Sequence, residues 1–151
     1  EKSLIEISIK ANSYIKKLSE ILKSNGGMLM IFDYGSIYPT GKSTIQSIKN
    51  HKYANFLENI GDQDVTYMIN FSHLRKLFRL YNLNVYGPFY QGNFLKSLGA
   101  IQRKKQLSIN ANKDVSRNIS QQLHRLIDKD QMGELFKVLI ISSKKIEMYE
   151  K

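Results

Sequence analysis

Cysteine is absent from all 151 residues of this chain. The sequence therefore excludes disulfide bonds, thiolate chemistry and zinc sites built on sulfur, which is typical of proteins in a reducing compartment. No apolar run approaches the roughly 18 residues that cross a bilayer, and no signal-peptide pattern opens the chain. From these features we expect a cytoplasmic protein with no membrane span.

Arginine is scarce beside lysine, although the formal net charge is +10. A basic balance of this size is compatible with nucleic acids or anionic surfaces as partners. The lysines, however, are scattered, with pairs at 16–17, 104–105 and 144–145. Arginine is the residue suited to bidentate phosphate and guanine contacts, so a solvated basic surface is favoured over a nucleic-acid face. A basic nucleic-acid-binding module is kept as an alternative.

The three histidines, His51, His73 and His124, lack the mutual spacing of metal ligands. We expect no metal site, and we expect His73 and His124 to face solvent.

Residues 35–43 are similar to a phosphate-binding P-loop, but five residues separate Gly35 from Gly41 where the motif has four. Pro39 also lacks an N–H donor. This stretch is predicted to be a turn followed by the start of a helix.

The most informative stretch is residues 26–35, GGMLMIFDYG. A short continuous apolar run bounded by glycines predicts a strand that is buried on both faces, as in a parallel sheet covered by helices. Ligands of open α/β sheets bind outside the carboxyl ends of strands. Asp33, Tyr34 and Gly35 therefore lie where a site is expected.

Apolar spacing and capping residues predict alternating helices and strands in a single domain over 1–151. The expected helices are 8–25, 74–81 with Asn70 or Ser72 as cap, 94–98, 101–108 and 114–128; the expected strands are 28–33, 83–90 and 136–142. Pro88 favours an edge position for the second strand. Val115 and Leu126 are among the residues expected to face inward from the last helix. Residues 36–70 are expected to be a long functional loop, in which 44–51 can share one helical face.

Five motifs follow one another in a characteristic order. They are Asp33-Tyr34-Gly35; Thr44, Ile45 and His51; Gly61, Asp64, Thr66 and Phe71; Gln91, Phe94, Leu95 and Gly99; and Met132-Gly133 through Leu139. In this order and spacing they resemble the MidA-like family of S-adenosylmethionine-dependent methyltransferases, from about residue 6 to the end. Asn70 stands where that family usually has aspartate.

The resemblance implies an α/β fold, the C-terminal part of a Rossmann-like class I methyltransferase sheet with flanking helices. Residues 8–35 would supply a helix and the fifth strand, and 83–90 and 136–142 the last two strands. The N-terminal strands would be missing, because the family's Gly-rich cofactor loop comes earlier and no G-x-G-x-G follows a strand here. The unpaired edge of the first strand would require the missing N-terminal half or a second copy.

The resemblance also implies methyl transfer from S-adenosylmethionine to an arginine of a partner protein, a respiratory complex I subunit, in the mitochondrial matrix if the source is eukaryotic. The candidate catalytic carboxylates are Asp33 and Asp64. Tyr34, Gly35, His51, Thr66, Asn70 and Gln91 are expected to line the cleft. The chain alone is expected neither to bind S-adenosylmethionine tightly nor to methylate. A non-catalytic interaction protein that retains the partner-binding loop is the other alternative.

Overall fold

A four-stranded mixed sheet forms the body of the computed structural model, which describes residues 6–50, 52–58 and 60–147. Its strand order is β5 (Ile69–Asn70), β1 (Met28–Ser36), β7 (Phe136–Ser142) and β6 (Asn84–Tyr90). The last strand in the sequence, β7, lies between β1 and β6 and is antiparallel to both. The pair of β1 and β5 is the parallel one in this sheet. The expected α/β architecture is confirmed, with a mixed sheet.

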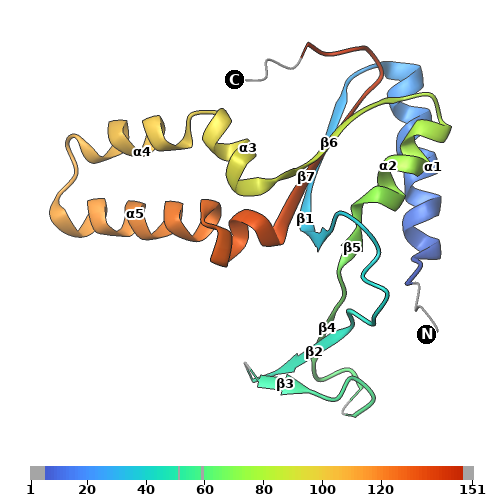
Figure 1. The fold of residues 1–151 in the computed structure, drawn as a ribbon, viewed down its shortest axis with the longest axis horizontal. Helices are drawn as coiled ribbons and strands as arrows, with labels where there is room; N and C mark the ends of the chain where they lie inside the picture. The colour runs from blue at the N-terminus through green and yellow to red at the C-terminus, as the bar shows by residue number, and fades with distance from the viewer. Residues whose placement is uncertain (1–5, 51, 59, 148–151) are drawn as a thin grey trace.

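Two helices cover one face of this sheet, as Figure 1 shows. Helix α1 (Ile9–Asn25) begins at Ser8, whose Oγ accepts from the N–H of Ala11 at 3.2 Å, and ends at Gly26 with φ of +74°. Helix α2 (Phe71–Leu80) begins at Asn70, whose side chain accepts from the N–H of His73 at 3.1 Å. Both caps agree with the sequence.

The hydrophobic core lies between these helices and the sheet. Phe71, Phe78, Leu139 and Ile141 are fully buried there. Leu29 and Ile31 of β1 pack against the same cluster. Burial of large apolar side chains is the main source of folding free energy, so this layer stabilises the body.

The opposite face of β1 corrects the expectation of a strand buried on both sides. Met28, Met30 and Phe32 are 54%, 50% and 42% exposed. Successive side chains of a strand point to opposite faces. Among the described residues, α1 and α2 cover one face of β1, while on the other face Phe94 of α3 (Gln91–Ser97) packs against Phe32, with 5.7 Å between the ring centroids, and leaves Met28 and Met30 about half exposed. The strand edge is also open, because β5 pairs with β1 only at Gly35 and Ser36.

Residues 36–70 are more regular than the sequence suggested. They form a second, three-stranded antiparallel sheet of β2 (Gln46–Lys49), β3 (Lys52–Ala54) and β4 (Asp64–Thr66), in the order β3-β2-β4. The expected helical face over 44–51 is therefore wrong, and 35–43 leads into a strand instead of a helix. His51 lies outside the described residues.

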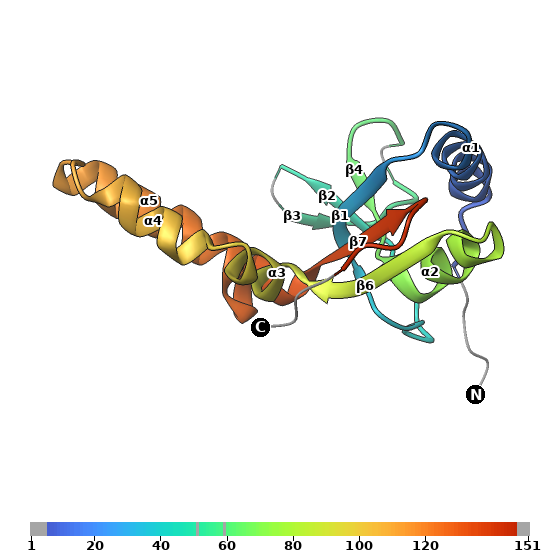
Figure 2. The ribbon, with the colours of Figure 1, turned by 90° about the horizontal axis from the view of Figure 1, so that it is seen from above.

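Strand β6 is the edge strand that Pro88 indicated, and its register with β7 shifts between Tyr86 and Phe89. After it come α3 (Gln91–Ser97), α4 (Ala100–Ser108), α5 (Lys113–Ile127) and the short π-helical turn η1 (Lys129–Gly133). Helices α4 and α5 form a hairpin that extends away from the sheet (Figures 1 and 2). Val115 and Leu126 are 48% and 40% exposed, so they do not face inward as expected.

Within the described ranges, no helix is both long and apolar enough to pass through a membrane.

Candidate functional site

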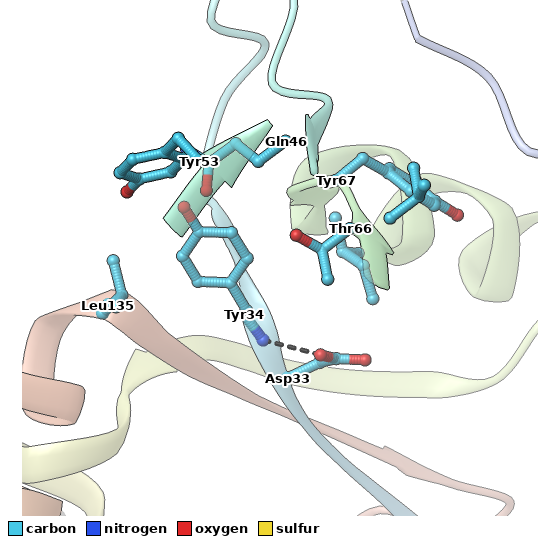
Figure 3. A pocket seen from close by; sticks show the side chains of 9 residues that line it. Asp33, Tyr34, Gln46, Tyr53, Thr66, Tyr67 and Leu135 are labelled. Carbon is cyan, nitrogen blue, oxygen red and sulfur yellow. Dashed lines mark hydrogen bonds between the residues drawn. The ribbon is translucent and has the colours of Figure 1, made fainter. Parts of the chain in front are cut away.

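An open hollow of about 690 Å³ lies at the carboxyl end of β1, between the main sheet and the small sheet. Figure 3 shows the side chains that line it. They are Asp33, Tyr34, Gln46, Tyr53, Val65, Thr66, Tyr67, Ile69 and Leu135. Three residues proposed from the sequence, Asp33, Tyr34 and Thr66, therefore meet in one place.

Asp33 is an exposed carboxylate at the end of β1. Its Oδ1 accepts from the N–H of Tyr34 at 2.7 Å, which orients the side chain. Among the described residues it forms no ion pair. A carboxylate without an ion-pair partner is available to a cationic group that enters the hollow.

Aromatic side chains form much of the wall around this carboxylate. The Tyr34 ring rises from β1 toward the small sheet, where Tyr53 and Gln46 lie (Figure 3). The ring packs at 6.2 Å from that of Phe136, the neighbouring residue on β7. Tyr53 itself is 79% exposed. Such faces suit a flat cation, which is attracted to the π-electrons of the ring.

The small sheet is held against the body by Thr44. Its N–H and Oγ1 both donate to the Glu6 carboxylate, at 2.8 and 2.5 Å, while its Oγ1 accepts from the N–H of Met68 at 2.9 Å. The Thr44 hydroxyl is the main cause that lowers the pKa of Glu6 below its usual 4.5. These bonds position β2 and β4, and therefore Gln46 and Thr66, beside β1.

Lys137 holds together two segments beside the hollow, the end of β1 and the turn before β7. Its side chain is buried, and its Nζ donates to the carbonyl oxygens of Gly35 at 2.8 Å, of Leu135 at 3.3 Å and of Glu134. Burial lowers the pKa of Lys137 from 10.5, and the Glu134 charge opposes that shift. Lys137 thus links the end of β1 to the turn before β7. No local pattern in the sequence singles out Lys137, although it belongs to the last motif.

Gly35 has a structural role, whereas Asp33 and Tyr34 line the first hollow. A Cβ there would lie 2.3 Å from the carbonyl oxygen of Ile69, so only glycine lets β5 approach β1. Gly35 faces a second open hollow of about 610 Å³, which Tyr90, Lys137 and Glu134 also line. Gly35 is therefore next to the first hollow but does not line it.

The remaining candidates lie apart from the first hollow. Asp64 is exposed on β4 and does not line it. The Asn70 side chain caps α2 and also accepts from Ser72 Oγ at 2.8 Å. Gln91 is 5% exposed, and its Nε2 donates to the Leu126 carbonyl at 2.9 Å, which ties α3 to α5.

Of the two described histidines, His124 is exposed beside Asp128, as expected, while His73 is half-buried near Asn12. In the part of the chain that the structure describes, no three His, Asp or Glu side chains gather as metal ligands would.

The residues present do not amount to a binding site for S-adenosylmethionine. The backbone of Ile69 already occupies the space beside the Cα of Gly35. Gly26 and Gly27 lie before β1 instead of after a strand. Among the described residues, no glycine-rich turn at a strand end is therefore available to bring backbone close to a nucleotide. The first hollow is open and is lined by residues of β1, of the small sheet and of the segment before β7.

Comparison with known proteins shows to which protein family this chain belongs. Residues 1–89 match the family model Methyltransf_28, described as "Putative S-adenosyl-L-methionine-dependent methyltransferase". The chain therefore belongs to this S-adenosylmethionine-dependent methyltransferase family, as the sequence motifs indicated.

Relatives with assigned names agree. The chain is 30% identical to "Protein arginine methyltransferase NDUFAF7, mitochondrial" of Danio rerio over 132 residues, which cover 87% of this chain and 31% of that protein. It is 30% identical to the Homo sapiens protein of the same name, over 87% of this chain and 30% of the relative. The chain thus spans about a third of the length of these relatives.

Two solved structures share the fold. An uncharacterized protein from Burkholderia thailandensis superposes with a TM-score of 0.81 at 21% identity, over 90% of this chain and 37% of that one. A second Burkholderia thailandensis protein, bound to S-adenosyl-homocysteine, gives a TM-score of 0.74 at 21% identity, over 87% and 35%. The chain thus shares the α/β fold of a part of each of these two structures.

Proposed function

We propose that this chain is the C-terminal portion of a protein arginine methyltransferase and supplies the substrate-binding wall of its cleft. The observation that carries this proposal is the exposed Asp33 carboxylate, which lacks an ion-pair partner among the described residues and lies in a hollow with tyrosine walls. A free carboxylate flanked by aromatic rings is complementary to a guanidinium group in both charge and shape.

Asp33 would hold the guanidinium and orient its nitrogen. Because the guanidinium pKa lies above about 12 in water, an acidic site is needed to bind it and to take its proton. Tyr34 would pack against the planar group. Asp64, two residues before Thr66 on β4, would be the second carboxylate, brought toward the hollow when substrate binds. Thr66 would donate or accept one hydrogen bond at the rim.

The relatives' name includes arginine methylation and mitochondria. By that likeness the substrate would be an arginine of a protein, and the place of action the mitochondrial matrix, or the cytoplasm in a bacterium. The family resemblance of the motifs further implies a respiratory complex I subunit as this substrate.

A second polypeptide segment would complete the fold on the open side of β1. Met28, Met30 and Phe32 present an apolar face there, and the edge beside them is unpaired. Exposed apolar surface and an open strand edge favour association with another chain. The completing segment would be an N-terminal methyltransferase half, which would also bring the cofactor loop. A second copy of this chain would cover the same surface without adding that loop.

The test is calorimetry with S-adenosylmethionine, on this chain alone and on this chain co-produced with the N-terminal part of a related methyltransferase. We expect no tight binding by the chain alone and micromolar binding by the pair. Micromolar binding by the chain alone would contradict the proposal.

In the reconstituted pair, Asp33→Asn should lower the rate of arginine methylation at least about 100-fold while leaving cofactor affinity unchanged. The matched control is Asp62→Asn, because Asp62 pairs with Lys49 at 3.9 Å and does not line the hollow. If the reconstituted pair binds cofactor and a complex I subunit but never methylates it, the non-catalytic alternative replaces this proposal.

A further inference from the structure

The α4–α5 hairpin, residues 98–127, has little core of its own. No residue of α4 is buried, and Ile127 is the only buried residue of α5. Isolated helices of this length are marginally stable in water, so most helical stability comes from tertiary packing. The hairpin therefore gains little stability from the burial of its own side chains.

Its exposed aliphatic side chains run along its whole length. They are Leu98, Ile101, Leu107, Ile109, Val115 and Leu126, between 40% and 75% exposed. Leu98 and Leu126 lie near the base and Ile109 near the tip. Beyond α5 the chain continues through η1 to Leu135, which lines the first hollow. The base of the hairpin is thus joined through a short segment of chain to a residue of the candidate site.

The charge on the hairpin is strongly one-sided. Its basic side chains are Arg103, Lys104, Lys105, Lys113, Arg117 and Arg125, against the single carboxylate of Asp114. This segment alone carries half of the formal net charge of +10. Among the described residues, none of these six forms an ion pair. The complementary surface is acidic.

We propose that the hairpin is a docking arm for an acidic amphipathic helix of the protein substrate, which would lie along α4 and α5. This inference rests on the proposed function and names a property of its substrate. An amphipathic helix that places apolar side chains against a hydrophobic surface is a common recognition mode, and opposite charges fix its orientation.

Three other occupants fit less well. A second hairpin would bring two strongly positive surfaces together, which is unfavourable. Single-stranded nucleic acid is usually bound by stacking on aromatic rings, and residues 98–127 contain none. A membrane would engage apolar residues gathered on one face or at the tip, whereas the exposed aliphatic residues here are spaced along the segment from base to tip, among basic residues.

The test uses the full chain without cofactor, so that its outcome is independent of methyl transfer. The probe is a fluorescent amphipathic peptide with leucines at helical spacing and glutamates elsewhere, titrated by anisotropy. The comparison peptide carries lysine at every glutamate position. We expect the acidic peptide to bind at least about tenfold more tightly, and its affinity to fall with added salt.

The variant Arg103→Glu/Lys105→Glu/Arg117→Glu should weaken binding of the acidic peptide at least about tenfold. Its matched control is Lys16→Glu/Lys17→Glu/Lys23→Glu on α1, which changes the net charge equally and should alter the affinity less than twofold. Circular dichroism verifies that both variants fold. If the hairpin variant does not fold, the inference is tested by the comparison of the two peptides and by the salt titration, both on the unmodified chain.

Equal affinity for the two peptides, or equal loss in the two variants, would overturn the inference. So would binding to vesicles of phosphatidylcholine and phosphatidylglycerol that exceeds binding to the peptide, because that result assigns the arm to a membrane. Loss of peptide binding when the N-terminal methyltransferase half is added would assign the hairpin to the interior of the complete enzyme. Failure of any of these tests leaves the cofactor and methylation results unaffected, and the reverse also holds.

Discussion

The body of this protein and its two appendages are stabilised in different ways. In the body, α1 and α2 bury a continuous apolar layer against β1, β6 and β7. The small sheet and the α4–α5 hairpin contribute no residue to that layer. The small sheet is tied to the body by hydrogen bonds through Thr44, and the hairpin exposes aliphatic residues along its length. The difference indicates that the body folds around its own core, while the two appendages gain little stability from that core.

The largest expected effect comes from a matched pair of leucine truncations. Leu74 on α2 is 9% exposed and Leu107 on α4 is 45% exposed. We expect Leu74→Ala to lower the free energy of unfolding by about 3 kcal/mol, because it leaves a cavity in the core. Leu107→Ala should cost less than about 0.5 kcal/mol, because an exposed helix position tolerates alanine. Urea denaturation measures both. Equal losses would show that the hairpin shares the body's core.

A smaller effect is expected where the body meets the site, at Lys137. Lys137→Met removes donors from three carbonyl oxygens, of which the bond to Gly35 is buried. We expect a loss of about 1–2 kcal/mol at neutral pH.

The pH dependence of this loss has a definite sign. Burial lowers the folded-state pKa of Lys137 below 10.5, so between that lowered pKa and 10.5 the unfolded state binds more protons than the folded state. The stability advantage of the unmodified chain over Lys137→Met should therefore grow as pH rises toward 10.5. Urea denaturation of both proteins at several alkaline pH values measures the difference, in which tyrosine ionisation common to both cancels. If the difference in unfolding free energy between the two proteins did not change with pH, burial would not lower the pKa of Lys137.

The smallest effect is expected at the tie between the small sheet and the body. Because hydrogen bonds from Thr44 lower the pKa of Glu6, its stabilising contribution is present above about pH 4.5 and is lost as the pH falls through the lowered value. Glu6→Gln should remove this acid dependence and cost under about 1 kcal/mol, since the site is close to solvent.

Hydrogen exchange is the suitable measurement, because the Met68 N–H donates to Thr44 Oγ1 and reports on the tie directly. Exchange should accelerate over 44–49 and 64–68 in Glu6→Gln, without change in α2. Glu20→Gln, on the exposed side of α1, is the control. Acceleration in α2 as well would show that the small sheet and the body unfold together.

The elements of the body could be predicted because their signals are local. Ser8 and Gly26 bound α1, Asn70 caps α2, and the apolar runs of β1 and β7 are long enough to stand out. The small sheet gave no such signal. Its strands are only three or four residues long, and its register joins residues far apart, such as Gln46 and Thr66. A short exposed strand has no apolar periodicity that distinguishes it from a loop.

The candidate site could be predicted only in part, because only some of its residues lie next to a clear local signal. Asp33 and Tyr34 end a clearly marked strand, so their place at the sheet edge follows from local sequence. Tyr53, Gln46 and Leu135 reach the hollow through the pairing of the small sheet and the turn before β7, which no local pattern reveals. Lys137 appears in sequence as one polar residue within an apolar strand, and only its buried contacts show what it holds.

By itself, the sequence determined the kind of protein: the helices and long strands, their α/β order, and the methyltransferase motifs. These depend on capping, spacing and residue type, which are properties of neighbouring residues. Only the tertiary structure decided that β7 lies between β1 and β6, that one face of β1 is open, and which candidates share a hollow. Those outcomes depend on contacts between segments that lie far apart in the sequence.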